Sequence, residues 1–167
     1  MIKQIIGHLG WVLTTFSRIT SLYKKNTACV YPLIIHDIPD CDRSSFEQLI
    51  DMLQKQHSFI SPKNFELYMN GNYQPKENQL LLTFDDGYYS NYLVAKEILE
   101  KRNIKAIFFI STGFVGLKDD SKVKTYLNKN LFANQLPPDS DTNKMIPMSW
   151  DNVHELIRLG HTIGAHT

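Results

Sequence analysis

The stretch Leu80-Leu81-Leu82-Thr83-Phe84-Asp85-Asp86-Gly87 decides the fold of this 167-residue chain. An apolar run that stops at two acids and a glycine is typical of a buried strand with carboxylates at its C-terminal end. Neighbouring side chains on a strand point in opposite directions. We therefore expect Asp85 and Asp86 to act at different points in space, one facing a metal and the other facing substrate or water.

A structural explanation of the acid pair is that it caps the helix that follows. Two adjacent carboxylates after five apolar residues are costly without a cation nearby, which favours the functional interpretation. The segment 161–166 has the same form, an apolar strand that ends on His166. A lone histidine is often a hydrogen-bonded core residue, but His166 ends a strand in the same predicted layer as Asp86. We therefore predict His166 as a metal ligand beside the acid pair.

A third strand, over 30–37, ends on His36 and Asp37. Because the carboxyl ends of parallel strands meet at one edge of a sheet, these two side chains are predicted to line the same site and to bind substrate. Hydrogen bonding within the loop is the alternative for both. The other histidines have no partner at ligand spacing and are predicted to be structural or solvated.

Strands and helices alternate along the whole chain. The strands are continuously apolar, as in parallel sheets covered on both faces, which predicts an α/β protein with about five strands. The polar residues 118–144 are long for a connection, and we expect them to cross the active face. Strands are predicted over 30–37, 59–61, 80–84, 106–110 and 161–165. Helices are predicted from the capping box Ser44 to Glu47, from Pro62, over 90–102, and from Ser149 to Gly160.

Composition excludes several classes of protein. The net charge of +1 and the lack of any Lys/Arg run longer than two argue against nucleic acid as a partner. Cys29 and Cys41 have no C-x-x-C spacing, so they predict neither a disulfide framework nor a zinc knuckle. Residues 1–28 are predicted to be a helix or lead segment, too short in its apolar part for a stable membrane span. The lack of a clear signal peptide favours a cytoplasmic location, with the cell envelope or the extracellular space as the alternative.

A family resemblance rests on three stretches. Thr83-Phe84-Asp85-Asp86-Gly87, then Lys105-Ala106-Ile107-Phe108-Phe109-Ile110, then Ser149-Trp150 with 160–167 resemble the polysaccharide deacetylases, the NodB-homology enzymes of carbohydrate esterase family 4. The resemblance runs from about residue 30 to the end. It implies an incomplete (β/α) barrel with parallel strands and outer helices, truncated here after about five strands. It also implies two parts, the lead segment over 1–28 and the C-terminally truncated deacetylase domain over 29–167.

The resemblance implies a metal-dependent hydrolysis of N-acetyl groups from an N-acetylated polysaccharide or oligosaccharide. Asp85 would be the general base, and Asp86 and His166 would hold a divalent metal, most often Zn²⁺. His166 would be the first histidine of a His-Thr-x-x-His motif. The second histidine and the general acid of the family pattern would lie beyond Thr167, so the 167 residues alone are expected to be inactive.

Two other classes stay open at this point. One is a catalytically inactive remnant, or a carbohydrate-binding fragment without turnover, which zinc content and acetate release distinguish from an enzyme. The other is a phosphoaspartate receiver-like domain, which also places paired acids at a strand end and which acyl-phosphate labelling tests. The sequence leaves the oligomeric state open.

Overall fold

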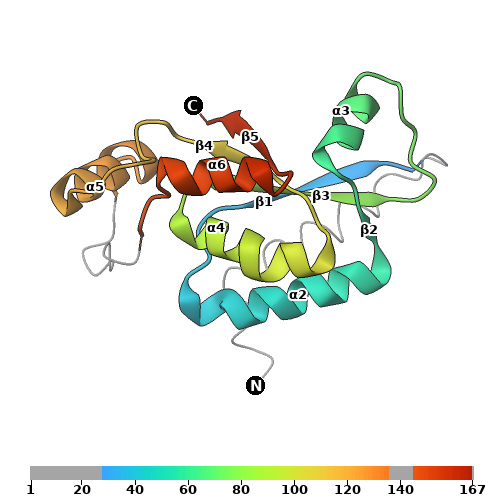
Figure 1. Cartoon of the computed structure of the whole chain (residues 1–167), viewed down its shortest axis with the longest axis horizontal. Helices are drawn as coiled ribbons and strands as arrows, with labels where there is room; N and C mark the ends of the chain where they lie inside the picture. Colours follow the sequence, from blue (N-terminus) through green and yellow to red (C-terminus); the bar gives the residue numbers. More distant parts are fainter. Residues whose placement is uncertain (1–27, 136–144, 167) are drawn as a thin grey trace.

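The computed structural model describes residues 28–135 and 145–166 of the chain. In this part, five strands form one parallel sheet that does not close on itself (Figure 1). This confirms the predicted α/β fold with the geometry of an incomplete barrel. The lead segment predicted over 1–28 lies outside the described residues except for its last position. The strands are β1 (Val30–Ile35), β2 (Ser58–Phe59), β3 (Gln79–Asp86), β4 (Ile107–Ile110) and β5 (Thr162–Ala165).

Strand β3 is the centre of the sheet. β1 pairs with it from Val30 opposite Gln79 to Ile35 opposite Phe84. On its other side β3 pairs first with β2 and then, from Thr83 onward, with β4. β5 pairs with β4. Because all these pairings are parallel, the strands deliver their C-terminal residues to one edge of the sheet.

Helices α2 (Arg43–Gln56), α4 (Tyr89–Val94) and α6 (Trp150–Arg158) cover one face of this sheet. Figure 1 shows α2 and α4 below the strands. The rings of Phe84 and Phe108 stack in the core between the sheet and these helices, with centroids 4.8 Å apart and planes 8° apart. Other buried residues of this core are Phe46 and Ile50 of α2, Val94 of α4, and Val153 and Leu156 of α6.

The start of α2 differs from the prediction. The expected capping box of Ser44 and Glu47 does not form, because a 3-10 turn, η1 (Asp40–Asp42), leads directly into the helix. Asp42 already has near-helical angles (φ −99°, ψ −8°), so Ser44 lies inside the helix instead of capping it. The Glu47 carboxylate instead accepts a hydrogen bond from Arg102 at 2.9 Å.

The other predicted helix starts are confirmed. Ser61 caps α3 (Pro62–Met69) by accepting a hydrogen bond from the Asn64 N–H, and Pro62 occupies the first helical position. Ser149 and Asn152 form a capping box at the start of α6. In both cases the capping side chain satisfies an N–H group that the first turn of a helix leaves without a partner.

The helix predicted over 90–102 is one continuous helical segment that combines α-, π- and 3-10-helical turns. After α4 come a π-helical turn, η2 (Ala95–Leu99), and a 3-10 turn, η3 (Glu100–Arg102). The segment ends at Asn103, which has a left-handed conformation with φ of 52°. Asparagine tolerates this conformation better than most residues, so it stops the helix here.

The long connection predicted over 118–144 is helical in its described part. Helix α5 (Asp120–Tyr126) and a π-helical turn, η4 (Leu127–Leu131), pack on Tyr88 and Phe114, which follow β3 and β4. The stretch therefore lies at the C-terminal edge of the sheet. Whether 136–144 cross the active face lies outside the described residues.

The connection returns to the sheet along residues 146–148. The Tyr89 N–H donates to the Ile146 carbonyl at 2.7 Å, and the Met148 N–H donates to the Gly87 carbonyl at 2.9 Å. The Gly116 N–H donates to the Met148 carbonyl at 2.8 Å. These bonds, which we call the clasp, join the turn after β3, the turn after β4 and the entry to α6.

Candidate active site

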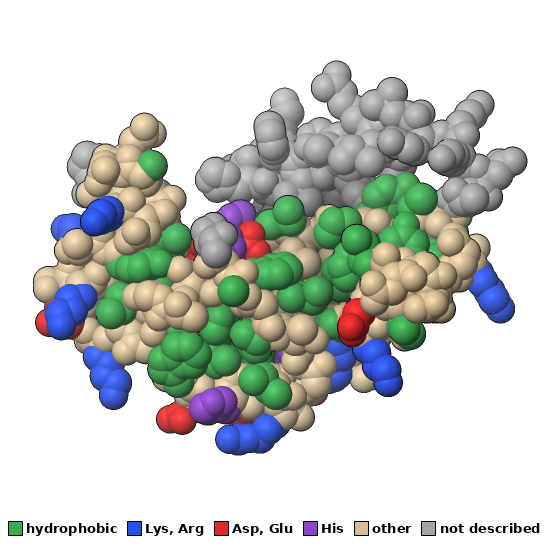
Figure 2. Space-filling view, turned by 90° about the horizontal axis from the view of Figure 1, so that it is seen from above, with side chains coloured by type: hydrophobic (Ala, Val, Ile, Leu, Met, Phe, Trp, Pro, Cys, Tyr) green, Lys and Arg blue, Asp and Glu red, His purple; other side chains and the backbone are tan. Residues whose placement is uncertain are grey.

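Acidic and histidine side chains meet where β3 and β5 end. The His166 Nε2 lies 3.6 Å from an Asp85 carboxylate oxygen and 4.0 Å from an Asp86 carboxylate oxygen. His36, just after β1, places its Nε2 4.0 Å from the same Asp85 oxygen. Figure 2 shows histidine and acidic side chains next to each other on this side of the molecule, beside hydrophobic ones. The structure thus brings together four of the five predicted site residues.

The expectation of strict strand alternation does not hold at Asp86, whereas the separate roles expected of Asp85 and Asp86 stay predictions. That expectation assumes extended backbone, but Asp86 has φ of 72°, in the left-handed region. In extended backbone Asp86 would share the side of Phe84, which faces the helices. The turn at Asp86 breaks this alternation, so both carboxylates approach the His166 imidazole.

His166 is held by the sheet that carries it. Its N–H donates to the Ile110 carbonyl at 2.9 Å, which continues the β4–β5 ladder one residue past β5. Two residues earlier, a Cβ on Gly164 would lie 2.6 Å from the Phe109 ring. Only glycine lets the Phe109 ring lie flat against β5 at this point. The register of β5 therefore fixes His166 beside the acids.

Burial shapes the electrostatics of the acid pair. The Asp86 side chain is only 7% exposed, and the Asp85 side chain is 16% exposed. Burial raises the pKa of Asp86, and the nearby Asp85 charge raises it further, while His36 and His166 act in the opposite direction. Within the described residues, no hydrogen-bond donor contacts the Asp86 carboxylate. A buried carboxylate in this state is stabilised by a cation.

Asp37 is bonded to the start of α4. Its carboxylate accepts a hydrogen bond from the Ser90 hydroxyl at 2.6 Å, and burial raises its pKa above the usual range. His36, in contrast, has 62% of its side chain exposed beside Asp85. The substrate-binding role of both residues stays a prediction.

A pocket of about 400 Å³ adjoins the cluster on the face of the sheet away from α2, α4 and α6. Asp85 and His166 form its polar end. The rest of its lining is mostly apolar and includes Pro32, Ile34, Phe65 and Phe109.

The donor set matches part of a metal site. Carboxylate oxygen from Asp86 and imidazole nitrogen from His166 are ligands that Zn²⁺ accepts. Within the described residues, however, no group of three or more His, Cys, Asp or Glu side chains could hold a metal ion. The residues therefore fit two positions of a zinc-type site, and the roles of Asp86 and His166 as ligands stay predictions.

Sequence reasoning missed three residues near the acids. Tyr88 is buried, and the pKa of its hydroxyl is raised by burial and by the charges of Asp86 and Asp37. Ser90 holds Asp37, and the fully buried Asn91 donates to the Asp85 carbonyl at 3.3 Å. The available signal was two small polar residues in the first turn of the helix directly after the acid pair.

Comparison with known proteins decides the family. A family model described as polysaccharide deacetylase matches residues 72–167, which include β3, β4, β5 and the site residues Asp85, Asp86 and His166. The chain belongs to the polysaccharide deacetylase family. The Bacillus subtilis (strain 168) protein named "Putative polysaccharide deacetylase YxkH" is 37% identical to it over 59 residues. That match covers 35% of this chain and 21% of YxkH.

Solved structures agree with this family at the level of the fold. IcaB from Ammonifex degensii superposes with a TM-score of 0.64 at 26% identity, over 86% of this chain and 54% of IcaB. The Streptococcus pyogenes deacetylase PplD, solved in complex with acetate, superposes with a TM-score of 0.50 at 19% identity, over 84% of this chain and 56% of PplD. The chain thus spans about half the length of these structures. None of the described helices has the length and apolarity needed to cross a bilayer.

Proposed function

We propose that this protein hydrolyses N-acetyl groups from an N-acetylhexosamine-containing polysaccharide with the help of a divalent metal ion, Zn²⁺ being the first choice. One observation carries the proposal, namely the approach of both the Asp85 and Asp86 carboxylates to the His166 imidazole, at 3.6 and 4.0 Å. Membership of the polysaccharide deacetylase family supports the reaction class.

Asp85 is the general base of the proposed reaction. Its carboxylate lies at the polar end of the open pocket, where it can accept a proton from a water molecule as that water attacks the acetyl carbonyl. The His166 Nε2 lies 3.6 Å from this carboxylate, next to the position where the water would be bound.

Asp86 and His166 are the proposed ligands of the metal ion. When bound, such an ion polarises the acyl carbonyl and lowers the pKa of water. Asp86 suits this role because its buried carboxylate has no hydrogen-bond donor among the described residues. A catalytic zinc site takes about three protein ligands, so we expect one more from outside the described residues.

Two matched substitutions test these roles in the full-length protein. Asp85→Asn should abolish acetate release from N-acetylglucosamine oligomers and retain bound zinc. Asp86→Asn should lose both activity and zinc. Acetate is measured enzymatically, and zinc by elemental analysis after gel filtration. Asp151→Asn, at an exposed acid in the first turn of α6, is the control and should change neither quantity.

Each alternative outcome has a clear meaning. If Asp85→Asn lost zinc and Asp86→Asn kept it, the two roles would be reversed. If the wild-type protein bound N-acetylglucosamine oligomers but released no acetate with zinc present, the carbohydrate-binding alternative would replace the enzyme. Removal of zinc by a chelator should stop acetate release, and added Zn²⁺ should restore it. The cellular location stays a prediction, which fractionation of cells would test.

A further inference from the structure

Asn91 is a fully buried polar side chain directly behind the acid pair. It lies in the first turn of α4, and its relative exposure is 0%. Its Nδ2 donates to the backbone carbonyl of Asp85 at 3.3 Å. Burying a carboxamide costs free energy unless its N–H groups find hydrogen-bond acceptors. The bond to the Asp85 carbonyl offsets part of this cost.

The Asp85 carbonyl also accepts a hydrogen bond from the Gly87 N–H at 2.9 Å. A bond from residue i+2 to residue i, with φ of 72° at Asp86 between them, defines a γ-turn of the rare, strained kind. Such turns persist only where the surrounding structure holds them. Gly87 meets part of this need, since it has φ of 96° and a Cβ there would lie 2.8 Å from Val115.

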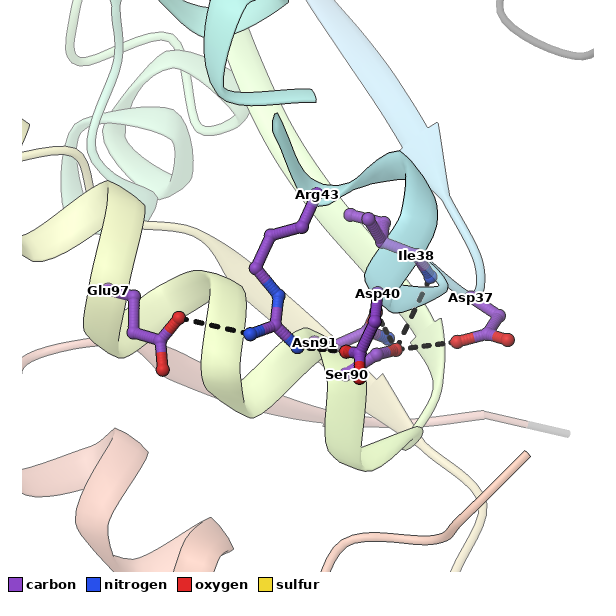
Figure 3. A network of polar contacts seen from close by, with 7 residues as sticks. All are labelled: Asp37, Ile38, Asp40, Arg43, Ser90, Asn91 and Glu97. Atoms are coloured by element: carbon purple, nitrogen blue, oxygen red, sulfur yellow. Dashed lines mark hydrogen bonds and ion pairs between the residues drawn. The ribbon is translucent and has the colours of Figure 1, made fainter. Parts of the chain in front are cut away.

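A second contact ties this region to the loop after β1 (Figure 3). The Ser90 hydroxyl donates to Asp37 at 2.6 Å and accepts from the Ile38 N–H at 3.3 Å. The Ser90 Oγ is also 3.5 Å from the side-chain Oδ1 of Asn91. The single hydroxyl hydrogen of Ser90, however, is used by the shorter bond to Asp37. Arg43 joins the same loop to Glu97 further along the helical segment, at 3.2 Å. The start of α4 is therefore tied to the loop after β1 at Ser90, the neighbour of Asn91.

We infer that Asn91 is a positioning residue for the acid pair. By holding the Asp85 carbonyl, its carboxamide keeps Asp86 in the left-handed conformation that turns both carboxylates toward His166. Without this bond the turn relaxes toward extended backbone, and the Asp86 carboxylate rotates toward the side of Phe84, away from His166. The consequence for catalysis rests on the proposed function, whereas the consequence for the backbone does not.

Asn91→Leu is the test variant, because leucine has a similar size and lacks the amide. The first readout is the nuclear Overhauser effect between the amide and Hα protons of Asp86, which is strong at positive φ and weak in extended backbone. It should be strong in the wild type and weak in Asn91→Leu. The affinity for Zn²⁺ alone should fall about 10–100-fold. In the full-length enzyme, kcat should fall about 100-fold with KM nearly unchanged, because the loss is one of geometry at the reacting groups.

Tyr92→Phe is the matched control on the same helix. It removes a buried hydroxyl that donates to Glu155 at 2.7 Å and has no contact with the turn. It should leave the Asp86 signal and the Zn²⁺ affinity within twofold of wild type. An equal loss in Tyr92→Phe would mean that general destabilisation explains the effect, and would overturn the inference.

Two further results would also overturn it. One is an Asp86 signal and a Zn²⁺ affinity in Asn91→Leu that equal those of the wild type. The other result comes from amide proton exchange in the wild type, so it can be obtained even if Asn91→Leu does not fold. In the wild type one Asn91 side-chain amide proton should exchange slowly with solvent, and fast exchange of both would remove the hydrogen bond on which the inference depends. If the wild type releases no acetate, the proposed function fails, but the backbone signals still decide the role of Asn91.

Discussion

The stability of this protein should fall between pH 7 and pH 5 because of one buried histidine, His161. Its side chain is fully buried at the start of β5. The ring accepts a hydrogen bond at Nδ1 from the Ala106 N–H at 3.1 Å and packs edge-on against Phe108, with centroids 5.3 Å apart. Burial lowers the pKa of His161 to about 4 from 6.5. The Glu100 carboxylate, 3.3 Å from Nε2, opposes this shift but is also paired with Lys105.

The direction of the pH effect follows from the two states of the chain. Between pH 6.5 and pH 4 the unfolded chain binds a proton at His161 and the folded protein does not, so the free energy of unfolding falls as the pH falls through this window. A pKa difference of this size corresponds to about 3 kcal/mol when fully expressed, and to about 2 kcal/mol between pH 7 and pH 5. Stability is therefore greatest above pH 6.5 as far as this group is concerned.

The assay is urea unfolding, followed by circular dichroism at pH 7, 6 and 5, of the wild type and His161→Asn. Asparagine cannot titrate here, and its oxygen can accept the Ala106 N–H. The variant should be less stable at pH 7 and should lose about 2 kcal/mol less than the wild type on going to pH 5. His154→Asn, at an exposed position of α6, is the control and should keep the wild-type pH dependence. Equal pH dependence in the wild type and His161→Asn would refute the reasoning.

Three substitutions test the packing that positions the site, each by urea unfolding. Gly164→Ala should destabilise the protein by about 1–3 kcal/mol, because the new Cβ meets the Phe109 ring, and Phe109→Leu in the same chain should recover part of this loss. Ser149→Ala should cost about 1 kcal/mol by removing the cap of α6. Phe84→Ala should cost about 3–5 kcal/mol, since its ring is 1% exposed and stacks on Phe108. A loss below 1 kcal/mol for Phe84→Ala would contradict the description of the core.

The fold was predictable because its signals are local. A continuous apolar run needs both faces covered, so β3 could be recognised from residues 80–84 alone. Pro62 at a first helical position and the cap Ser149 place two helix starts within one residue. The capping box at Ser44 was wrong for a reason the local pattern does not contain. The preceding 3-10 turn had already started the helix, and Arg102, far along the chain, takes the Glu47 side chain.

The site was predictable in its members but not in its geometry. The strand ends could be predicted from the sequence, and they carry Asp85, Asp86 and His166 as expected. The left-handed backbone at Asp86 could not be predicted from the sequence, because aspartate adopts extended backbone far more often. Its conformation depends on Asn91 and Gly87 acting together on one carbonyl. An asparagine in the first turn of a helix resembles a solvated residue until the fold buries it.

The clasp at residues 146–148 has a consequence for how this protein can diverge. It fixes the backbone next to the acid pair, because the turns after β3 and β4 are bonded to the same short segment that leads into α6. The chain segment between Gly116 and Ile146 therefore starts and ends at residues that the clasp holds in place. Insertions and deletions within that stretch can therefore change the length of the connection without moving Asp85 or Asp86. Natural variation in chain length should therefore concentrate there, while the clasp itself tolerates little change in length.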